Sequence, residues 1–412
     1  MKIRYRVLGL LVVASIITYV DRICISVAGT SIQEDLGLSL EQWGWVLGAF
    51  VVSYGALEIP IGAYCDRVGP RRVLTRIVVT WSLFTALTGV AQSFRQLLVI
   101  RFLFGAGEAG AFPSFSAAIM RWFPQTERAR AQSAVWMATR LGGALAPLLV
   151  IPIQQAYGWR ASFFVFGAAG FVWAAAWYFW FRDHPAENPV ITKEELAELT
   201  PSVEPAGGHA AKLQWSVFKK PTMWWLMAMY YANAWCGFFY LSWMYTFLVR
   251  GRGFTPNELL ALSWLPFLLG AGANLIGGWA SDALVRRHGL KFGRRAVGFC
   301  GLAAATGFLA LTIFTEHKVW TVVWLALAYG SSDLALPVAW AVCLDVGGKH
   351  TGTVTAAMNT AGQLGAFCTT VCFGYLVSAF GTYNAPLVPI AVMSAVGAMA
   401  WLQIDATKRV AD

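Results

Sequence analysis

A series of long apolar stretches constrains this chain more than any other feature of its sequence. Each stretch is close to the roughly 20 residues that a helix needs to cross a lipid bilayer. In lipid the backbone must satisfy its own hydrogen bonds, so such stretches are expected to be helices. The twelve stretches are Val7–Ala28, Trp43–Tyr64, Val73–Gln92, Leu97–Phe123, Ala131–Ile153, Ala161–Phe181, Thr222–Val249, Glu258–Ala280, Ala296–Phe314, Val319–Val346, Gly352–Ala379 and Ala385–Ile404.

Composition excludes the soluble classes of protein. Of the 412 residues, 58% are hydrophobic and only 13% are charged, whereas an ordinary globular domain has about 25% charged residues. Such a chain cannot cover a water-facing surface with polar groups. The sequence therefore predicts an all-α membrane protein that lies in a lipid bilayer, with twelve transmembrane helices.

The basic residues indicate orientation and do not indicate a nucleic-acid partner, although the formal net charge is +10. If the N-terminus is cytoplasmic, most of the Lys and Arg fall in cytoplasmic segments, as the positive-inside rule requires. We therefore expect a multi-pass protein with both termini in the cytoplasm. The few basic residues on the other side are Arg95, Arg160, Arg250, Arg252 and Lys318.

A polar segment divides the chain into two similar halves. We expect an N-terminal six-helix bundle over residues 1–182, a cytoplasmic linker over 183–221 and a C-terminal six-helix bundle over 222–412. Each half carries a basic turn after its second helix, with Asp66-Arg67 in the first and Asp282 in the second. Such a repeat is typical of transporters that move two bundles about a central site.

Charged residues inside the apolar stretches are the candidate functional residues, because a charge at the centre of a membrane helix costs at least about 2.5–3.5 kcal/mol. With 1.5 Å of rise per residue, Arg22, Tyr54 and Glu108 lie about 20–24 Å from the cytoplasmic side. Arg101 is two helical turns from Glu108 and shares its face. Together with Asp21 these residues are expected to surround one cavity. Structural ion pairs are the alternative interpretation, and two Arg with two acids at matched depth favour function.

Two further charges, Glu58 and Arg140, are expected at about 14–15 Å from the cytoplasmic side. We therefore expect a gating or structural ion pair that involves Glu58, Arg140 or both. In the C-terminal half, Asp333 and Asp345 are the acids within helix spans, and Asp345 is near a cytoplasmic end.

The basic turn of the first half resembles the signature of the major facilitator superfamily. It reads Gly-x-x-x-Asp-Arg-x-Gly-x-Arg-Arg from Gly62 to Arg72. The resemblance implies the major facilitator fold, with two six-helix bundles. An aspartate here can bind the N-terminus of a neighbouring helix while the Arg side chains stay in the cytoplasm. We expect Asp66, Arg67 and Asp282 to form a conformational latch that does not touch substrate.

The fourth stretch narrows the resemblance. The run from Arg101 to Pro113, followed by Trp122-Phe123-Pro124, is similar to the anion:cation symporter family, which includes proton-coupled transporters of galactonate, hexuronate and glucarate. The resemblance implies that Arg22 and Arg101 bind a substrate carboxylate. It also implies that Asp21 and Glu108 are the proton-coupling acids and that Tyr19 and Tyr54 bind substrate. An Arg side chain can bind a carboxylate with two parallel hydrogen bonds.

The C-terminal half is expected to supply the other wall of the cavity, with Trp340 and Asn359 as substrate-binding residues. Core packing is as good an interpretation for Trp340 alone, whereas a buried amide such as Asn359 needs partners. Gln363 stands where the family often has Asn, and the segment Leu334–Ala339 carries no hydroxyl group. These differences keep a less hydroxylated or an aromatic acid open as substrate.

The sequence therefore predicts a bacterial inner-membrane symporter that moves a small organic anion, a sugar acid such as a hexuronate or aldonate, together with protons by alternating access. A symporter of an aromatic or other monocarboxylate, an organophosphate/phosphate exchanger and a membrane sensor are the alternatives. No catalytic constellation or metal-ligand set is recognisable, so we expect no enzyme activity, no catalytic residues, no bound metal and no cofactor other than protons as the coupling ion. We expect a monomer that binds no nucleic acid.

Overall fold

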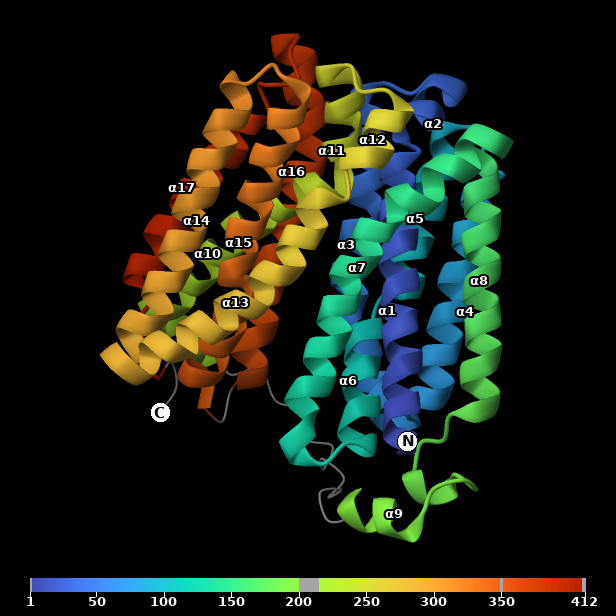
Figure 1. Ribbon diagram of the computed structural model, residues 1–412, viewed down its shortest axis with the longest axis vertical. Coiled ribbons are helices and arrows are strands. Elements are labelled where there is room, and N and C mark those ends of the chain that lie inside the picture. The colour runs from blue at the N-terminus through green and yellow to red at the C-terminus, as the bar shows by residue number, and fades with distance from the viewer. Residues whose placement is uncertain (1, 200–214, 349–350, 410–412) are drawn as a thin grey trace. The chain divides into compact units, whose positions relative to one another are not determined.

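The computed structural model describes residues 2–199, 215–348 and 351–409, and all regular secondary structure in those ranges is helical (Figure 1). The all-α prediction is confirmed. The helices of the first part of the chain are α1 (Ile3–Val27), α2 (Gly29–Leu36), α3 (Leu40–Val68), α4 (Pro70–Thr88), α5 (Phe94–Glu108), α6 (Ala111–Trp122), α7 (Gln125–Tyr157), α8 (Trp159–Trp180) and α9 (Lys193–Leu199). Those of the second part are α10 (Pro221–Ser242), α11 (Met244–Thr246), α12 (Pro256–Leu262), α13 (Leu265–His288), α14 (Leu290–Phe314), α15 (Lys318–Gly347), α16 (Thr351–Phe380) and α17 (Leu387–Gln403).

Each stretch predicted to span the membrane consists mostly of helix. By length and composition, nine spans there are long and apolar enough to cross a membrane. The three remaining predicted stretches are the helices α4, α10 and α17. Helix α4 begins with several Arg residues, α10 is rich in Trp and Tyr, and α17 is an apolar helix of 17 residues.

Three of the predicted single helices are interrupted. The stretch Leu97–Phe123 is divided into α5 and α6 at Ala109 and Gly110, where Gly110 has a φ of 83°. The stretch Thr222–Val249 is divided into α10, α11 and a π-helical turn at Phe247–Gly251, and Glu258–Ala280 is divided into α12 and α13. A left-handed φ is accessible mainly to glycine, and Gly110 therefore permits the break between α5 and α6. The pattern of apolar residues continues across this break and so does not predict its position.

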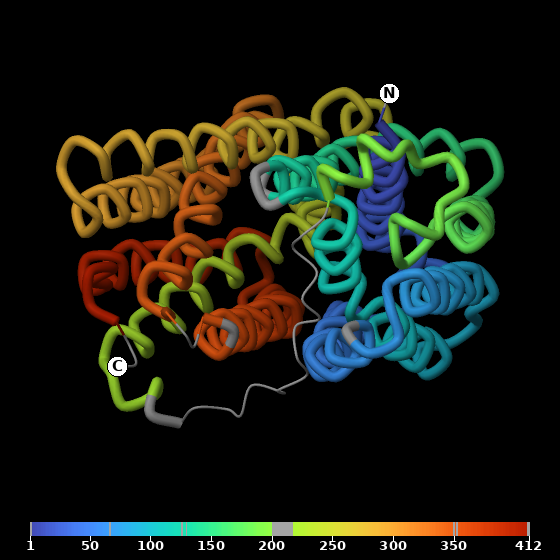
Figure 2. Tube along the Cα trace, turned by 90° about the horizontal axis from the view of Figure 1, so that it is seen from below, coloured from blue at the N-terminus to red at the C-terminus, as the bar shows by residue number. Residues whose placement is uncertain are grey.

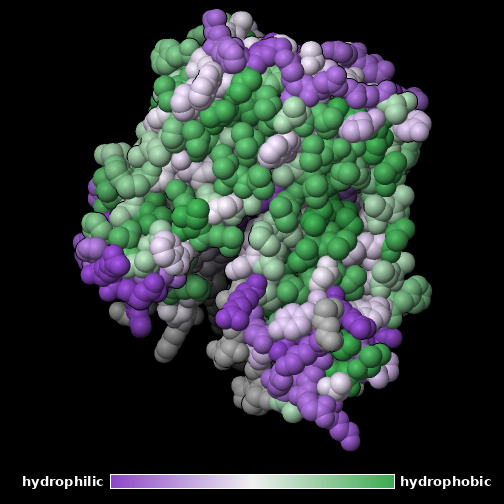
Figure 3. All heavy atoms as spheres, viewed as in Figure 1, coloured by the Kyte–Doolittle hydropathy of each residue, from purple (hydrophilic) through white to green (hydrophobic). Residues whose placement is uncertain are grey.

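The chain forms two compact units, which are described separately. The first contains Met1–Cys24 and Val52–Ala210, and the second contains Ile25–Val51 and Ala211–Asp412. In the first unit α4 packs against α5, α6 and α8, and α7 packs against α6 and α8. In the second unit α15 packs against α13, α14 and α16, while α10 packs against α16 and α17. Apolar side chains cover the flanks of the helices, and hydrophilic residues gather near their ends (Figure 3).

The short helix α9 lies against the end of the first unit at which α1 begins (Figures 1 and 2). The two carboxylate oxygens of Glu195 accept hydrogen bonds from the backbone N–H groups of Ile3 and Arg4, at 2.8 and 3.0 Å. Glu198 accepts from Lys2 and from Arg4, each at 2.6 Å. These contacts satisfy backbone donors at the start of α1, where a negative charge is favourable.

Candidate functional site

An ion pair between α1 and α5 forms the centre of the candidate site in the first unit. The Nε atom of Arg22 donates a hydrogen bond to Oε1 of Glu108 at 2.5 Å. The side chain of Arg22 is 10% exposed and that of Glu108 is 1% exposed. The predicted proximity of these two residues is therefore observed, and they are directly paired.

Three aromatic rings surround the Arg22 guanidinium. Its central carbon lies 4.6 Å from the ring centroid of Tyr54, 5.4 Å from that of Tyr19 and 5.7 Å from that of Phe112. Rings at these distances attract a cation through their negative faces. Phe112 in turn stacks on Trp136 of α7, with centroids 4.9 Å apart. The sequence predicted Tyr19 and Tyr54, but it gave no signal for Phe112 other than its position four residues after Glu108.

The second guanidinium, that of Arg101, is buried on the same helix as Glu108. It is 3% exposed and lies over the ring of Phe104, 4.3 Å from the centroid. Its charge interacts with those of Glu108 and Asp21. The expectation that Arg101 and Glu108 share one helix face is thus confirmed by their common burial in α5.

Asp21 completes a cluster of four charges, which we name the charge cluster: Asp21, Arg22, Arg101 and Glu108. Asp21 is 2% exposed, and neither of its carboxylate oxygens is hydrogen-bonded to another described residue. The neutral hydroxyl group of Thr85 on α4 lies beside it. One oxygen of Glu108, Oε2, likewise makes no hydrogen bond to the described residues. Two buried acids therefore keep oxygen atoms that can accept a proton.

The break between α5 and α6 directly follows the charge cluster. Helix α5 ends at Glu108, and α6 begins three residues later at Ala111. A Cβ atom at Gly110 would lie 2.4 Å from Cγ2 of Ile61 on α3, so no larger residue fits there without movement. Interrupted helices in membrane proteins are tolerated where they are buried in protein or line a cavity, and they commonly mark binding sites.

Glu58, one of the two residues expected in a gating pair, lies one turn after Tyr54 on α3. It accepts a hydrogen bond from the Tyr54 hydroxyl at 3.4 Å. Tyr54 thus lies between Arg22 and Glu58. The predicted ion pair of Glu58 or Arg140 stays a prediction.

The residues predicted in the C-terminal half belong to the second unit. Trp340 on α15 packs edge-on against Tyr230 of α10, with ring centroids 6.3 Å apart. Asn359 is half-buried on α16. Their proposed contact with substrate stays a prediction.

The basic turns have partners that the sequence did not indicate. Asp183, which follows α8, accepts a hydrogen bond from the backbone N–H of Arg71 at 2.9 Å and pairs with Arg121 at 3.3 Å. It therefore caps the start of α4. Arg67 is exposed in the last turn of α3, and the side chain of Asp66 lies outside the described residues.

In the second unit the corresponding turn contains a three-residue ion-pair network. Arg294 of α14 lies 3.0 Å from Asp282 of α13 and 3.0 Å from Asp345 of α15. The network connects three helices at one end of the unit. The role of Asp66, Arg67 and Asp282 as a latch stays a prediction.

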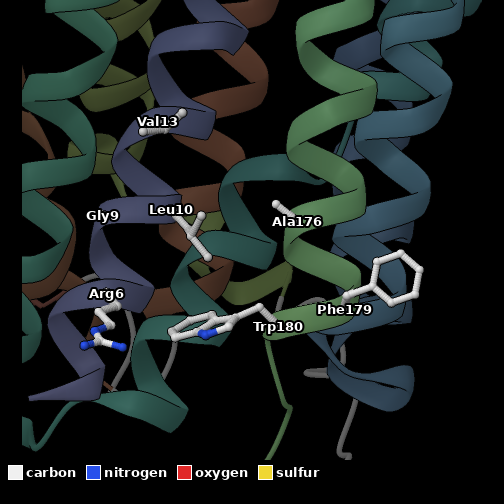
Figure 4. Close-up of a pocket in the computed structure, with 7 residues that line it drawn as sticks. All are labelled: Arg6, Gly9, Leu10, Val13, Ala176, Phe179 and Trp180. Carbon is white, nitrogen blue, oxygen red and sulfur yellow. The ribbon is translucent and has the colours of Figure 1, made fainter.

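A pocket of about 570 Å³ in the first unit is separate from the charge cluster (Figure 4). It lies between α1 and α8 and is almost entirely apolar. Its nearest α1 residue to the cluster is Val13, nine residues before Arg22, which corresponds to about 13 Å along the helix. Its lining residues are Arg6, Gly9, Leu10, Val13, Ala176, Phe179 and Trp180.

Comparison with known proteins identifies the family. The model of the Major Facilitator Superfamily matches residues 11–370. The chain belongs to the Major Facilitator Superfamily. It is a multi-pass membrane transporter and not an enzyme.

Relatives within this superfamily transport organic anions, as their names state. The chain is 36% identical to a probable sulfoacetate transporter of Cupriavidus necator, over 98% of this chain and 94% of that protein. It is 31% identical to a hexuronate transporter of Bacillus subtilis, over 91% and 88% of the two chains. It is 29% identical to a D-galactonate transporter of Escherichia coli, over 99% and 97%. The predicted relationship to sugar-acid transporters is confirmed.

A solved structure supports the fold. A bacterial homologue of the human lysosomal transporter Spinster, in an inward-facing and occupied conformation, superposes with a TM-score of 0.81. The two chains are 20% identical, and the match covers 97% of this chain and 96% of the other. The predicted major facilitator fold is thereby confirmed.

Proposed function

We propose that this transporter carries a small organic anion, a sugar acid such as a hexuronate or aldonate, together with protons. The observation that carries the proposal is the charge cluster, in which two buried guanidinium groups lie among two buried carboxyl groups. An Arg side chain keeps its charge and binds carboxylates in a defined geometry. Buried acids beside it are suited to exchange protons as the charge of the site changes.

The charges suggest how anion and proton are coupled. With both acids ionised, the two positive and two negative charges cancel, and Glu108 occupies Arg22. A proton on Glu108 weakens that ion pair and leaves Arg22 able to bind a substrate carboxylate. A proton on Asp21 removes the negative charge that attracts Arg101 and leaves the positive charge of Arg101 available to the substrate. Each proton bound thus makes one positive charge available to the anion, and loss of a proton favours release.

Transport would follow from alternating access of the two halves of the chain, a motion that the internal repeat supports. The distribution of basic residues supports cytoplasmic termini. The relatives from Cupriavidus necator and Escherichia coli support the inner membrane as the location. We propose that the monomer is the transporting species.

A short sulfonated carboxylate is a second candidate substrate. The relative named as a probable sulfoacetate transporter is 36% identical over nearly the whole chain. With both acids protonated, the charge cluster carries two positive charges, which match the two negative charges of such an anion. A sugar monocarboxylate would neutralise only one of them.

The test of this function begins with a thermal-stability screen of the purified protein. The probes are D-glucuronate, D-galactonate, sulfoacetate, benzoate and glucose 6-phosphate, since a ligand that binds only the folded form raises stability by mass action. Stabilisation by glucuronate or galactonate supports the sugar-acid proposal. Stabilisation by sulfoacetate or benzoate alone changes the substrate and keeps the site, whereas a response to the phosphorylated sugar alone supports an exchanger.

Proton coupling is tested in proteoliposomes with the stabilising anion. We expect Asp21→Asn to abolish uptake driven by a proton gradient while exchange of anion across the membrane persists. Asp35→Asn, an exposed acid on α2, is the control and should behave as the unmodified protein. Robust proton-driven uptake by Asp21→Asn would contradict the coupling role.

A further inference from the structure

A buried acid in the second unit is not used by the proposed function. Asp333 lies 15 residues from the start and 14 residues from the end of α15, so it is about 21–22 Å from either end of a helix that spans the membrane. The residue is 5% exposed. An ionisable residue at this depth is costly and is a candidate for a functional role.

One partner of this acid is an amide on a neighbouring helix. Nδ2 of Asn274 on α13 donates a hydrogen bond to Oδ2 of Asp333 at 3.0 Å. The same nitrogen donates to the carbonyl oxygen of Gly270 at 3.2 Å. Asn274 is therefore fixed by its own helix in a position that reaches the carboxyl group. A neutral amide can keep this hydrogen bond whether the carboxyl group is protonated or ionised.

The surroundings of Asp333 are closely packed. A Cβ atom at Gly270 would lie 2.6 Å from Oδ2 of Asp333, so the carboxyl group lies directly on the backbone of α13. On the other side, a Cβ atom at Gly301 of α14 would lie 2.7 Å from the carbonyl oxygen of Ser331. Helices this close leave little room for water around the acid. A lasting negative charge is unfavourable in such surroundings.

The polar groups around Asp333 differ in exposure. Asn274, which donates to Asp333, is half-buried, whereas Asp333 itself is buried. The next residue in the chain, Ser332, is also buried and donates a hydrogen bond to Oδ1 of the half-buried Asn233 on α10 at 3.0 Å. The carboxyl group is thus one hydrogen bond away from a more exposed polar residue, Asn274 on α13.

The other ionisable groups near Asp333 are tyrosine hydroxyl groups and a cysteine thiol. Tyr329 lies one turn earlier on α15, and its ring packs at a tilt of 46° against Tyr240 of α10 with centroids 4.4 Å apart. The Tyr240 hydroxyl donates to the carbonyl oxygen of Leu325 at 2.9 Å. Cys236 of α10 donates to the carbonyl oxygen of Ile390.

In the described part of the chain, the charged residues of the other helices that pack on α15 lie toward the helix ends. In α13 the ionisable residues lie at its end, from Asp282 onward. In α14 the basic residues lie near its start and Cys300 follows them, and in α16 the ionisable residues are Cys368, Cys372 and Tyr375. Arg294, the basic residue of α14 that reaches α15, pairs with Asp345 near the end of that helix.

We propose that Asp333 is a further proton-binding site, separate from the charge cluster. It takes up and releases one proton in each transport cycle while the Asn274 amide holds its carboxyl group. The proton comes from water and forms one O–H bond on the carboxylate, and the same bond breaks when the proton is released to water. This role in transport rests on the proposed proton coupling. Binding of the proton itself does not, because it requires only the site.

The first experiment measures protonation without any substrate. Infrared difference spectra of the purified protein in lipid, recorded over a range of pH, report the C=O stretch of each carboxyl group that gains a proton. We expect Asp333→Asn to lose one titrating carboxyl band. Asn274→Ala should keep the band and shift its frequency, because the hydrogen-bond partner is removed.

The matched control is Asp345→Asn, on the same helix, whose acid is paired with Arg294 at 3.0 Å. It should retain the band assigned to Asp333. Loss of the same band in Asp345→Asn, or an unchanged spectrum in Asp333→Asn, would overturn the proposal. Asp333→Ser is a second variant that removes the carboxyl group with a smaller side chain.

The second experiment measures coupling in proteoliposomes with D-glucuronate as probe. Each coupled proton multiplies the equilibrium accumulation ratio about ten-fold per unit of pH gradient. We expect Asp333→Asn to accumulate about ten-fold less at a gradient of one pH unit while anion exchange continues. Unchanged accumulation would show that Asp333 exchanges no proton during transport. Stimulation by Na⁺ that is lost in Asp333→Asn would assign the site to a metal cation. Both results overturn the proposal. If glucuronate is not transported at all, the sugar-acid function fails and the infrared result still decides the site.

Discussion

Arg22 and Glu108, which are 86 residues apart in the sequence, are joined by a hydrogen-bonded ion pair 2.5 Å long between α1 and α5. Both side chains are nearly inaccessible to solvent. A buried ion pair is weak evidence for stability, because desolvation offsets most of its attraction. Its position beside two further buried charges and directly before a helix break favours a role in binding and release.

Glu108→Gln should make anion binding less dependent on pH. In the proposed mechanism, Glu108 loses its proton as the pH rises and then competes with the anion for Arg22, so the affinity for the anion should fall as pH rises. A Gln side chain carries no charge and competes weakly at any pH. Calorimetric titration with the stabilising anion at several pH values would measure this. If the affinity of Glu108→Gln for the anion changed with pH as steeply as that of the unmodified protein, the pH dependence would belong to another group.

Arg101→Ala should weaken anion binding, because the variant removes one of the two cationic groups that we propose to bind the carboxylate. Hydrogen bonds to charged groups contribute about 1.5–3 kcal/mol, which corresponds to at least a ten-fold loss of affinity. Calorimetry would measure the affinity. Arg95→Ala is the matched control on the same helix, because Arg95 is exposed. Equal affinities for the two variants would exclude Arg101 from the binding site.

The sequence predicted the helices and the charge cluster because both depend on simple quantities. Apolar length marks each membrane helix, and rise per residue places Arg22 and Glu108 at a similar depth. The break at Gly110 and the packing of Phe112 on Arg22 depend on contacts with α3 and α1, which no local pattern records. The cap of α4 by Asp183 joins residues 112 positions apart. Such contacts become visible only when the helices are packed.

The helix break gives a test that separates backbone strain from a steric clash. Gly110 and Gly37 both adopt left-handed backbone conformations, with φ of 83° and 61°. A Cβ atom at Gly110 would meet Ile61, whereas one at Gly37 would meet nothing within 4 Å. Gly37→Ala should therefore lower stability by about 1–3 kcal/mol. Gly110→Ala should lower it further and reduce transport, because α5 and α6 must shift beside Glu108.

Thermal unfolding and anion uptake of the two variants, measured side by side, would check this. Equal stability and full uptake in both would show that the break can be rearranged without consequence for the charge cluster. A loss of anion uptake in Gly37→Ala alone would contradict the prediction and would show that transport depends on the end of α2 and not on the break between α5 and α6.

The contact of α9 with α1 gives the last prediction. Glu195→Ala removes the acceptor for two backbone N–H groups at the start of α1, and loss of a helix cap costs about 0.5–2 kcal/mol. Glu194→Ala is the matched control, because Glu194 is an exposed neighbour on the same short helix. Thermal unfolding should separate the two variants, with the larger loss in Glu195→Ala.

The pH dependence of this contact follows from Glu198. Hydrogen bonds from Lys2, and then from Arg4, lower the pKa of the Glu198 carboxyl group below its usual value. A lowered pKa means that the contact contributes fully above about pH 4.3, the usual value for Glu, and is lost as the pH falls below it. Since these side chains are partly exposed, the contribution should also decrease with added salt. A Glu198→Gln variant whose stability differs from that of the unmodified protein equally at pH 3 and pH 7 would contradict this assignment.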